Sequence, residues 1–220
     1  MRPMRKGDIA QVTKIDREVF PTIWPLVNYQ RELDNRLAHY IVVCDAEKTV
    51  EEPRVEVASG KGLSGLASKV RRLFNYERRF GEGLSPSSRE YIIGFAGFWA
   101  MADEAHLTNI AVRESSRHQG IGELLLISII DLAVELNASI MTLEVRASNT
   151  AAQSLYRKYG FSQVGLRRGY YINEKEDGVL MSTENINADS FQAHFQQLKQ
   201  DYAGRWGTPL HQIARKLSTK

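Results

Sequence analysis

The chain has 220 residues, a formal net charge of +3, 43% hydrophobic residues and 25% charged residues. This length fits one large domain, or one domain with extensions, and the composition is that of an ordinary globular protein. The small positive charge does not by itself indicate a nucleic-acid partner, and it is compatible with an acidic ligand such as a nucleotide cofactor. Cys44 is the single cysteine, so no internal disulfide can form, which fits a reducing, cytoplasmic location.

The sequence predicts neither a membrane segment nor a metal site. Residues 1–6 contain no apolar signal segment. The longest apolar run, residues 92–102, is too short to span a bilayer and contains two glycines. The five histidines lack the mutual spacing of metal ligands.

The first part of the chain contains short helical and strand patterns. Apolar residues at helical spacing predict a helix over residues 8–20, with Asp8 as its N-cap. A second helical piece is expected over residues 24–37, and residues 39–44 are typical of a buried strand. Residues 46–88 are first acidic, then glycine-rich, then basic, and we interpret them as a long insertion between two strands. The apolar spacing of residues 66–76 allows a short helix within it.

The second part has a more regular pattern, and the order of elements indicates a mixed α/β fold. A helix over residues 120–136 is apolar almost all round, so we expect it to be buried on more than one side. The other expected elements are strands at 91–101 and 105–112 forming a hairpin, a strand at 140–145, a helix at 150–159 ended by Gly160, and strands at 163–171 and 178–181.

The tail beyond residue 182 is expected to be a helical extension. Apolar residues repeat at helical spacing after Asp189, which we interpret as an N-cap, and Thr208 and Pro209 are typical of the start of another helical turn. We therefore expect one domain over residues 1–181, with the insertion at 46–88, and a separate extension over residues 182–220.

A glycine-containing loop joins the strand ending at Val112 to the long helix. Gly120 and Gly122 stand where this helix begins, and Arg117 and His118 add donors or positive charge. Free backbone N–H groups at a helix N-terminus form an anion site, so the loop can bind a pyrophosphate. The alternative is a tight turn that only needs glycine.

A carboxylate and a phenol follow, twelve positions apart across a strand and a helix. Glu144 stands between apolar Leu143 and Val145, where a charge is costly unless it is paired or faces a cleft. Its alternative role is an ion pair with Arg146 or another base. Tyr156 can be either a core aromatic or a proton donor.

These segments together resemble the GNAT superfamily of acyl-CoA-dependent N-acetyltransferases, and most closely its RimI type, the ribosomal-protein-alanine N-acetyltransferases. The resemblance rests on Arg117-x-x-Gly120-x-Gly122, on residues 143–149 (Leu-Glu-Val-Arg-Ala-Ser-Asn), on residues 155–161 (Leu-Tyr-Arg-Lys-Tyr-Gly-Phe) and on residues 168–171. It covers about residues 1–181 without the insertion. It implies a GNAT-type mixed α/β (α+β) fold, with a central mixed sheet of about seven strands and helices on both faces.

The resemblance also implies a cofactor and roles for particular residues. Acetyl-CoA is the acetyl donor, no metal is required, Glu144 is the general base, and Tyr156 is the general acid. Asn149, otherwise explained as a helix cap, contacts the coenzyme. The groove for a peptide acceptor is formed by Phe20, Trp24, Tyr170 and Tyr171. The expected coenzyme contacts are Ile110, Ala111, Val112, Arg117, His118, Gln119, Gly120, Ile121, Gly122, Glu123 and Asn149.

The expected acceptor is the N-terminal α-amine of a protein or peptide, with a ribosomal protein as one candidate. Transfer is expected to be direct, because no cysteine or serine is placed as a nucleophile in this segment. Two alternatives remain: an acetyltransferase acting on a lysine side chain or small-molecule amine, and a non-catalytic module that keeps the coenzyme-binding fold. Direct nucleic-acid binding is not favoured, because the arginine pairs at 71–72 and 78–79 are better explained as a solvated loop.

Overall fold

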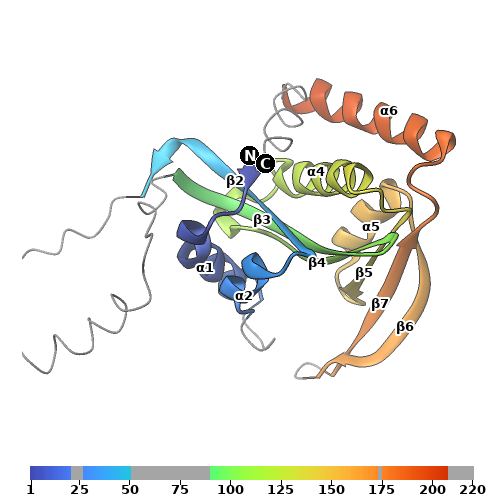
Figure 1. The fold of residues 1–220 in the computed structure, drawn as a ribbon, viewed down its shortest axis with the longest axis horizontal. Coiled ribbons are helices and arrows are strands. Elements are labelled where there is room, and N and C mark those ends of the chain that lie inside the picture. The colour runs from blue at the N-terminus through green and yellow to red at the C-terminus, as the bar shows by residue number, and fades with distance from the viewer. Residues whose placement is uncertain (21–26, 51–89, 173–174, 208–220) are drawn as a thin grey trace, which may run out of the picture.

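The computed structural model describes residues 1–20, 27–50, 90–172 and 175–207. Within these ranges seven strands form one sheet: β1 (Arg2–Pro3), β2 (Ala38–Thr49), β3 (Glu90–Met101), β4 (Glu104–Val112), β5 (Ile140–Arg146), β6 (Phe161–Tyr171) and β7 (Glu176–Thr183). Their order across the sheet is β1-β2-β3-β4-β5-β7-β6 (Figure 1). Every neighbouring pair is antiparallel except β4 and β5, which are parallel. The predicted seven-stranded mixed sheet is confirmed.

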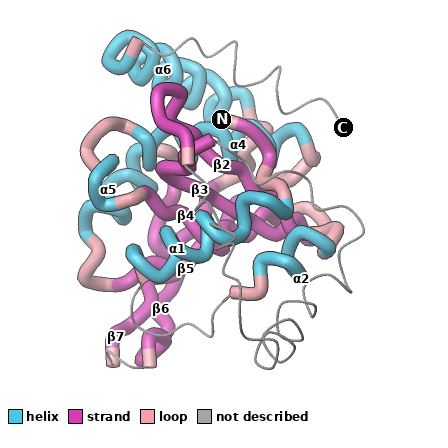
Figure 2. The backbone as a smooth tube through the Cα atoms, turned by 90° about the vertical axis from the view of Figure 1, so that its left-hand side faces the viewer, coloured by secondary structure: helices cyan, strands magenta, loops and turns pink. Residues whose placement is uncertain are grey.

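Helices cover both faces of the sheet, as predicted. They are α1 (Ile9–Val19), α2 (Tyr29–Asp34), α4 (Ile121–Glu135), α5 (Thr150–Lys158) and α6 (Asp189–Trp206), with short 3-10 turns at Lys6–Asp8 and Glu114–Ser116. Helices α1 and α2 lie on one side, and α4 lies on the other with α6 beyond it (Figure 1). Figure 2 shows the same arrangement from the side, with α6 at the top of the molecule and α1 and α2 below. None of the helices in the described part of the chain is long and apolar enough to cross a membrane.

The two faces of the sheet bury two separate clusters of apolar side chains. Side chains alternate along a strand, so on β2 Tyr40 and Val42 pack with α1 and α2, while Ile41 and Val43 pack with α4. Helix α4 is buried on several sides, as its almost continuous apolar sequence predicts.

Strands β4 and β5 diverge halfway along their length. They pair from Glu104 opposite Ile140 to Leu107 opposite Leu143, although β4 continues to Val112 and β5 continues to Arg146. A register shift in the pairing of β3 with β4 also lies here, next to Thr108. Beyond Leu107 the edge of β4 therefore faces a gap rather than β5, and this gap positions the site described below.

Helix α6 runs antiparallel to α4. Lys199 forms an ion pair with Asp131 at 2.9 Å, and Arg205 lies 3.9 Å from Glu123. Residues later in α6 therefore contact residues earlier in α4. The last turn of α6 consequently lies against the first turn of α4. The apolar face of α6 that joins the core contains Phe195, Leu198 and Tyr202.

Asp8 is the N-cap residue of α1, as predicted, whereas the predicted N-cap of α6 is wrong. Asp8 precedes α1, but its carboxylate does not cap this helix. It accepts two hydrogen bonds from the Arg2 guanidinium, at 2.6 and 2.9 Å, and one from the Arg5 backbone N–H at 2.8 Å. Asp189 is the first residue of α6 rather than its N-cap, which is Ala188.

The predicted insertion and second helix also need correction. Strand β2 extends to Thr49, which pairs with Glu90, so residues 46–49 are strand rather than insertion. Within the described residues the second helix is limited to Tyr29–Asp34. The predicted helix at 66–76, the turn at Thr208 and Pro209, and Trp24 lie outside the described residues.

Candidate active site

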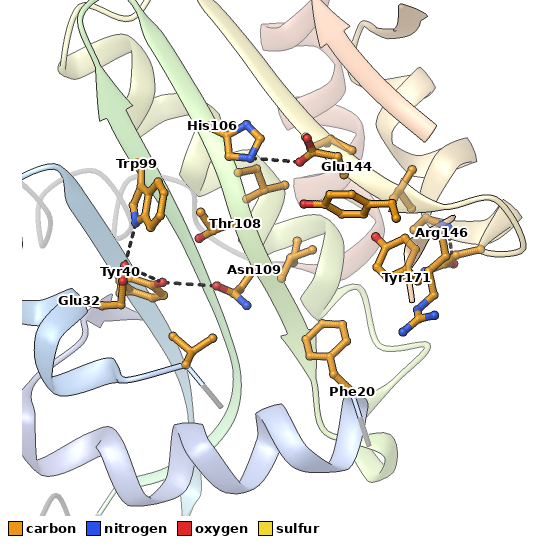
Figure 3. Close-up of a pocket in the computed structure, with 18 of the residues that line it drawn as sticks. Phe20, Glu32, Tyr40, Trp99, His106, Thr108, Asn109, Glu144, Arg146 and Tyr171 are labelled. Atoms are coloured by element: carbon orange, nitrogen blue, oxygen red, sulfur yellow. Dashed lines mark hydrogen bonds and ion pairs between the residues drawn. The ribbon is translucent and has the colours of Figure 1, made fainter. Parts of the chain in front are cut away.

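A cavity of about 860 Å³ opens where β4 and β5 diverge (Figure 3). Its walls come from α2, β2, β3, β4, β5, α5 and β6, so it brings together segments far apart in the sequence. The residues that line it include Phe20, Glu32, Tyr40, Trp99, His106, Thr108, Asn109, Ile110, Glu144, Arg146, Asn149, Tyr156, Tyr170 and Tyr171.

Glu144 lies on β5 just past the last residue paired with β4. Its side chain is only 7% exposed, and its two oxygens lie 3.1 Å from His106 Nε2 and 3.1 Å from an Arg167 guanidinium nitrogen. The hydrogen bond from His106 lowers the pKa of Glu144, burial opposes this, and the charges of His106 and Arg167 add to the lowering. The carboxylate is therefore held in its ionised form while it lines the cavity.

His106 connects Glu144 to two further side chains. Its Nδ1 atom lies 2.7 Å from the Thr142 hydroxyl oxygen, and that hydroxyl donates to Glu104. Because the Thr142 proton points to Glu104, its oxygen accepts from Nδ1–H, and Nε2 is left facing Glu144. His106 was not among the predicted site residues. The available signal is a polar residue between apolar Ala105 and Leu107 in a strand.

Tyr156 lies on α5 and reaches the same cavity. The residue is 5% exposed, and its ring lies 5.7 Å from that of Phe161. Burial, with a smaller effect of nearby Tyr171, raises the pKa of the phenol. Its hydroxyl therefore keeps its proton near neutral pH and can donate it.

Asn149 and two tyrosines complete this side of the cavity. The Asn149 side chain accepts a hydrogen bond from the Ala152 backbone N–H at 3.1 Å, so it caps α5 as well as lining the cavity. The rings of Tyr170 and Tyr171 lie edge to face at 5.2 Å, and the Arg146 guanidinium lies 4.1 Å from the Tyr171 ring centre. Burial raises the pKa of Tyr171 to about 12, so this phenol too is protonated.

The glycine loop, residues 117–122, lies outside the cavity at the start of α4. Gly120 is the N-cap and adopts a left-handed conformation with φ of 75°. The first backbone N–H groups of α4 have no acceptor within the helix, and the Arg117 and His118 side chains beside them are exposed. These features fit an anion such as a pyrophosphate.

The two glycines of this loop have different surroundings. A Cβ atom on Gly120 would lie 2.5 Å from Cε2 of Trp206, whereas one on Gly122 would have Val112 Cγ2, at 3.9 Å, as its nearest neighbour. The Glu123 carboxylate is bonded to Lys158 at 2.5 Å and to the Tyr159 hydroxyl at 2.8 Å. Any contact of Glu123 with an anion is therefore made by its backbone.

The structure divides the predicted site residues into two groups. One group lines the cavity: Phe20, Ile110, Glu144, Asn149, Tyr156, Tyr170 and Tyr171. The other does not: Ala111 is buried against α1 and α2, Val112 packs against the core near α4, and residues 117–123 form the loop and the start of α4. Glu32, Tyr40 and Trp99 also line the cavity and were not predicted.

Comparisons with known proteins agree with this geometry. Residues 68–161 match the acetyltransferase (GNAT) family model. A protein of Bacillus subtilis (strain 168), provisionally named a ribosomal protein bS18-alanine N-acetyltransferase, is 31% identical over 182 residues, which are 82% of this chain and 92% of that protein. The ribosomal protein bS18-alanine N-acetyltransferase of Escherichia coli (strain K12) is 41% identical over 90 residues, which are 40% of this chain and 61% of that protein.

The fold is also similar to solved structures. The crystal structure of the ribosomal-protein-S18-alanine N-acetyltransferase from Escherichia coli superposes with a TM-score of 0.57 and 22% identity, covering 83% of this chain and 91% of that one. The split sheet, the glycine loop and the cavity with its carboxylate and phenol define an acyl-transferring enzyme of the acetyl-CoA-dependent class. The chain belongs to the GNAT acetyltransferase family.

Proposed function

We propose that the enzyme transfers an acetyl group from acetyl-CoA to the N-terminal α-amine of a protein, with ribosomal protein bS18 as the first acceptor to test. The observation that carries the proposal is the presence of Glu144 and Tyr156 in one cavity at the divergence of β4 and β5. The names of the relatives from Bacillus subtilis and Escherichia coli support the choice of acceptor.

Glu144 is the proposed general base. An amine must lose a proton as it attacks a thioester, and an ionised carboxylate in the cavity accepts that proton directly or through a water molecule. His106 Nε2 lies 3.1 Å from the carboxylate and donates a hydrogen bond that orients it. Thr142 holds the Nδ1 side of the ring, so the imidazole is fixed beside the proposed base.

Tyr156 is the proposed general acid. Acetyl-CoA, when bound, supplies an acetyl group activated as a thioester. Burial keeps the Tyr156 phenol protonated, so its hydroxyl can give a proton to the departing sulfur. The glycine loop and the start of α4 would hold the pyrophosphate, and the edge of β4 beyond Leu107, which β5 leaves unpaired, would hold the extended arm of the coenzyme.

Direct transfer is the mechanism that these residues favour. No cysteine or serine is found among the described residues that line the cavity, and the Thr108 hydroxyl there donates to the Gly97 carbonyl at 3.0 Å. Cys44 lies on β2 away from the cavity, and burial raises the pKa of its thiol. A covalent acyl-enzyme therefore has no placed nucleophile among these residues.

Acetylation of a peptide panel, read by intact mass, tests the proposal. The panel holds peptides that copy protein N-termini, bS18 included, the same peptides with a blocked α-amine and one internal lysine, and a polyamine. We expect acetylation of the free N-terminal peptides alone. Reaction at the lysine or the polyamine would replace the proposed acceptor, and absence of thiol release with every acceptor would favour a non-catalytic module.

A further inference from the structure

Glu32 of α2 places a second carboxylate in the cavity, away from Glu144. In Figure 3 it lies beside Tyr40 and Trp99, with Thr108 and Asn109 between this group and Glu144. Nothing in the transfer of an acetyl group requires a second carboxylate at that distance from the base. Glu32 is therefore available to contact another part of a bound ligand.

Neighbouring strands fix the position of the Glu32 carboxylate. The Trp99 indole N–H donates to Oε2 at 2.7 Å, and the Tyr40 hydroxyl lies 3.3 Å from the same oxygen. Tyr40 can take this position because it lies opposite Gly97, where a Cβ atom would come within 2.2 Å of its ring. Its hydroxyl also lies 3.3 Å from Asn109 Oδ1. Both hydrogen bonds orient the carboxylate through Oε2, and since no hydrogen bond from the described residues reaches Oε1, that oxygen is left for a ligand.

Glu144 has basic side chains beside its carboxylate, and Glu32 differs from it in this respect. Glu144 has His106 and Arg167 beside it, whereas the hydrogen bonds that Glu32 receives from the described residues come from the neutral Trp99 and Tyr40 groups. Arg31 also lines the cavity, but among the described residues no ion pair joins it to Glu32. A partly buried carboxylate that is hydrogen-bonded but lacks a cation gains most from a cationic ligand.

We propose that Glu32 is a specificity residue that binds a cationic side chain, arginine or lysine, located in the acceptor shortly after its reacting N-terminal residue. This inference rests on the proposed function. The reacting amine itself must lie at Glu144 and lose its charge to attack, so it cannot also be the cation at Glu32. The Trp99 ring, which is 36% exposed and lines the cavity, adds a favourable contact for a guanidinium or ammonium group.

Two peptides that differ in a single charge test this proposal with the full-length enzyme and acetyl-CoA. One peptide carries arginine within the first few residues after its N-terminal residue, and the other carries citrulline, which has nearly the same shape without the charge. We expect wild type to prefer the arginine peptide by roughly tenfold in kcat/KM, mostly through KM, the size typical of a hydrogen bond between charged groups. In Glu32→Gln the preference should fall towards equality, because the amide oxygen still accepts from Trp99 and Tyr40 but carries no charge.

Asp34→Asn is the matched control. Asp34 lies on the same helix and loses the same charge, but it is exposed, pairs with Lys6 and does not line the cavity. It should keep the wild-type preference. Equal use of both peptides by wild type, or an unchanged preference in Glu32→Gln, would overturn the inference while N-terminal acetylation still stands. Loss of preference in Asp34→Asn would also overturn it, since the effect would then come from net charge. Failure of wild type to acetylate any peptide would overturn the proposed function and this inference together.

Discussion

The Nε2 atom of His106 lies 3.1 Å from Oε2 of Glu144, and the two residues come from strands that pair only up to the preceding position of β5. This contact is the largest cause of the lowered pKa of Glu144. It links the proposed base to Thr142 and Glu104 on the far side of the imidazole ring. The base is therefore part of a hydrogen-bonded chain rather than an isolated carboxylate.

Replacing His106 should move the pH dependence of the reaction. Because the pKa of Glu144 is lowered, its base form persists to lower pH, and activity falls only as the pH drops through that lowered value. His106→Leu removes the main cause, so the pKa of Glu144 should rise and the acidic limb of kcat/KM should shift to higher pH. Thr142→Val, which leaves the imidazole in place, should shift this limb less. An acidic limb that does not move in His106→Leu would show that the contact does not set the pKa of the base.

Removing the proposed base or acid should stop transfer but leave the donor bound. Glu144→Gln and Tyr156→Phe each keep the shape of the side chain and lose one proton-transfer group, so kcat should fall by roughly a hundredfold or more. The dissociation constant for acetyl-CoA, measured by calorimetry, should stay near the wild-type value. Wild-type turnover in both variants would remove these residues from the mechanism.

The two loop glycines should respond differently to alanine. Gly120→Ala forces a left-handed alanine and a contact with Trp206, so it should cost roughly 1–2 kcal/mol of stability and weaken acetyl-CoA binding. Gly122→Ala meets only an ordinary contact in the first turn of α4 and should change stability by about 0.5 kcal/mol or less. Denaturant unfolding and binding measurements on both variants check this. Equal losses of stability and binding in the two variants would mean that neither the left-handed backbone nor the close approach of Trp206 explains the need for glycine at position 120.

The buried ion pair between Arg2 and Asp8 should be important for stability. Asp8 is fully buried, and Asp8→Ala would remove the carboxylate that pairs with the Arg2 guanidinium, whose side chain is only 10% exposed. We expect a loss of about 3–5 kcal/mol in the free energy of unfolding, measured with denaturant. Asp34→Ala, which breaks an exposed pair with Lys6, should change stability far less. Similar losses in the free energy of unfolding for the two variants would show that burial of the Arg2–Asp8 pair does not decide its effect on stability.

The sequence predicted those features that depend on short stretches of chain. The strand that contains Glu144, the turn at Asn149 and the helix that contains Tyr156 follow one another within a few residues, and their patterns are clear. The contacts of Trp99 and Tyr40 with Glu32 could not be predicted, because strand register and the packing of α2 bring them together. Asp8 has the sequence position of a cap, but a buried arginine six residues away takes its carboxylate. Local patterns and the family resemblance together therefore led to the proposed catalytic pair, and tertiary pairing determined what surrounds it.

The most direct test of the account is a single assay of where the acetyl group goes and whether Glu144 is needed. One peptide with a free α-amine and no lysine is compared with a second that has a blocked α-amine and one lysine, using wild type and Glu144→Gln with acetyl-CoA. We expect wild type to acetylate the first peptide alone and Glu144→Gln to acetylate neither at a comparable rate. Acetylation of the lysine in the second peptide, or wild-type rates in Glu144→Gln, would contradict it.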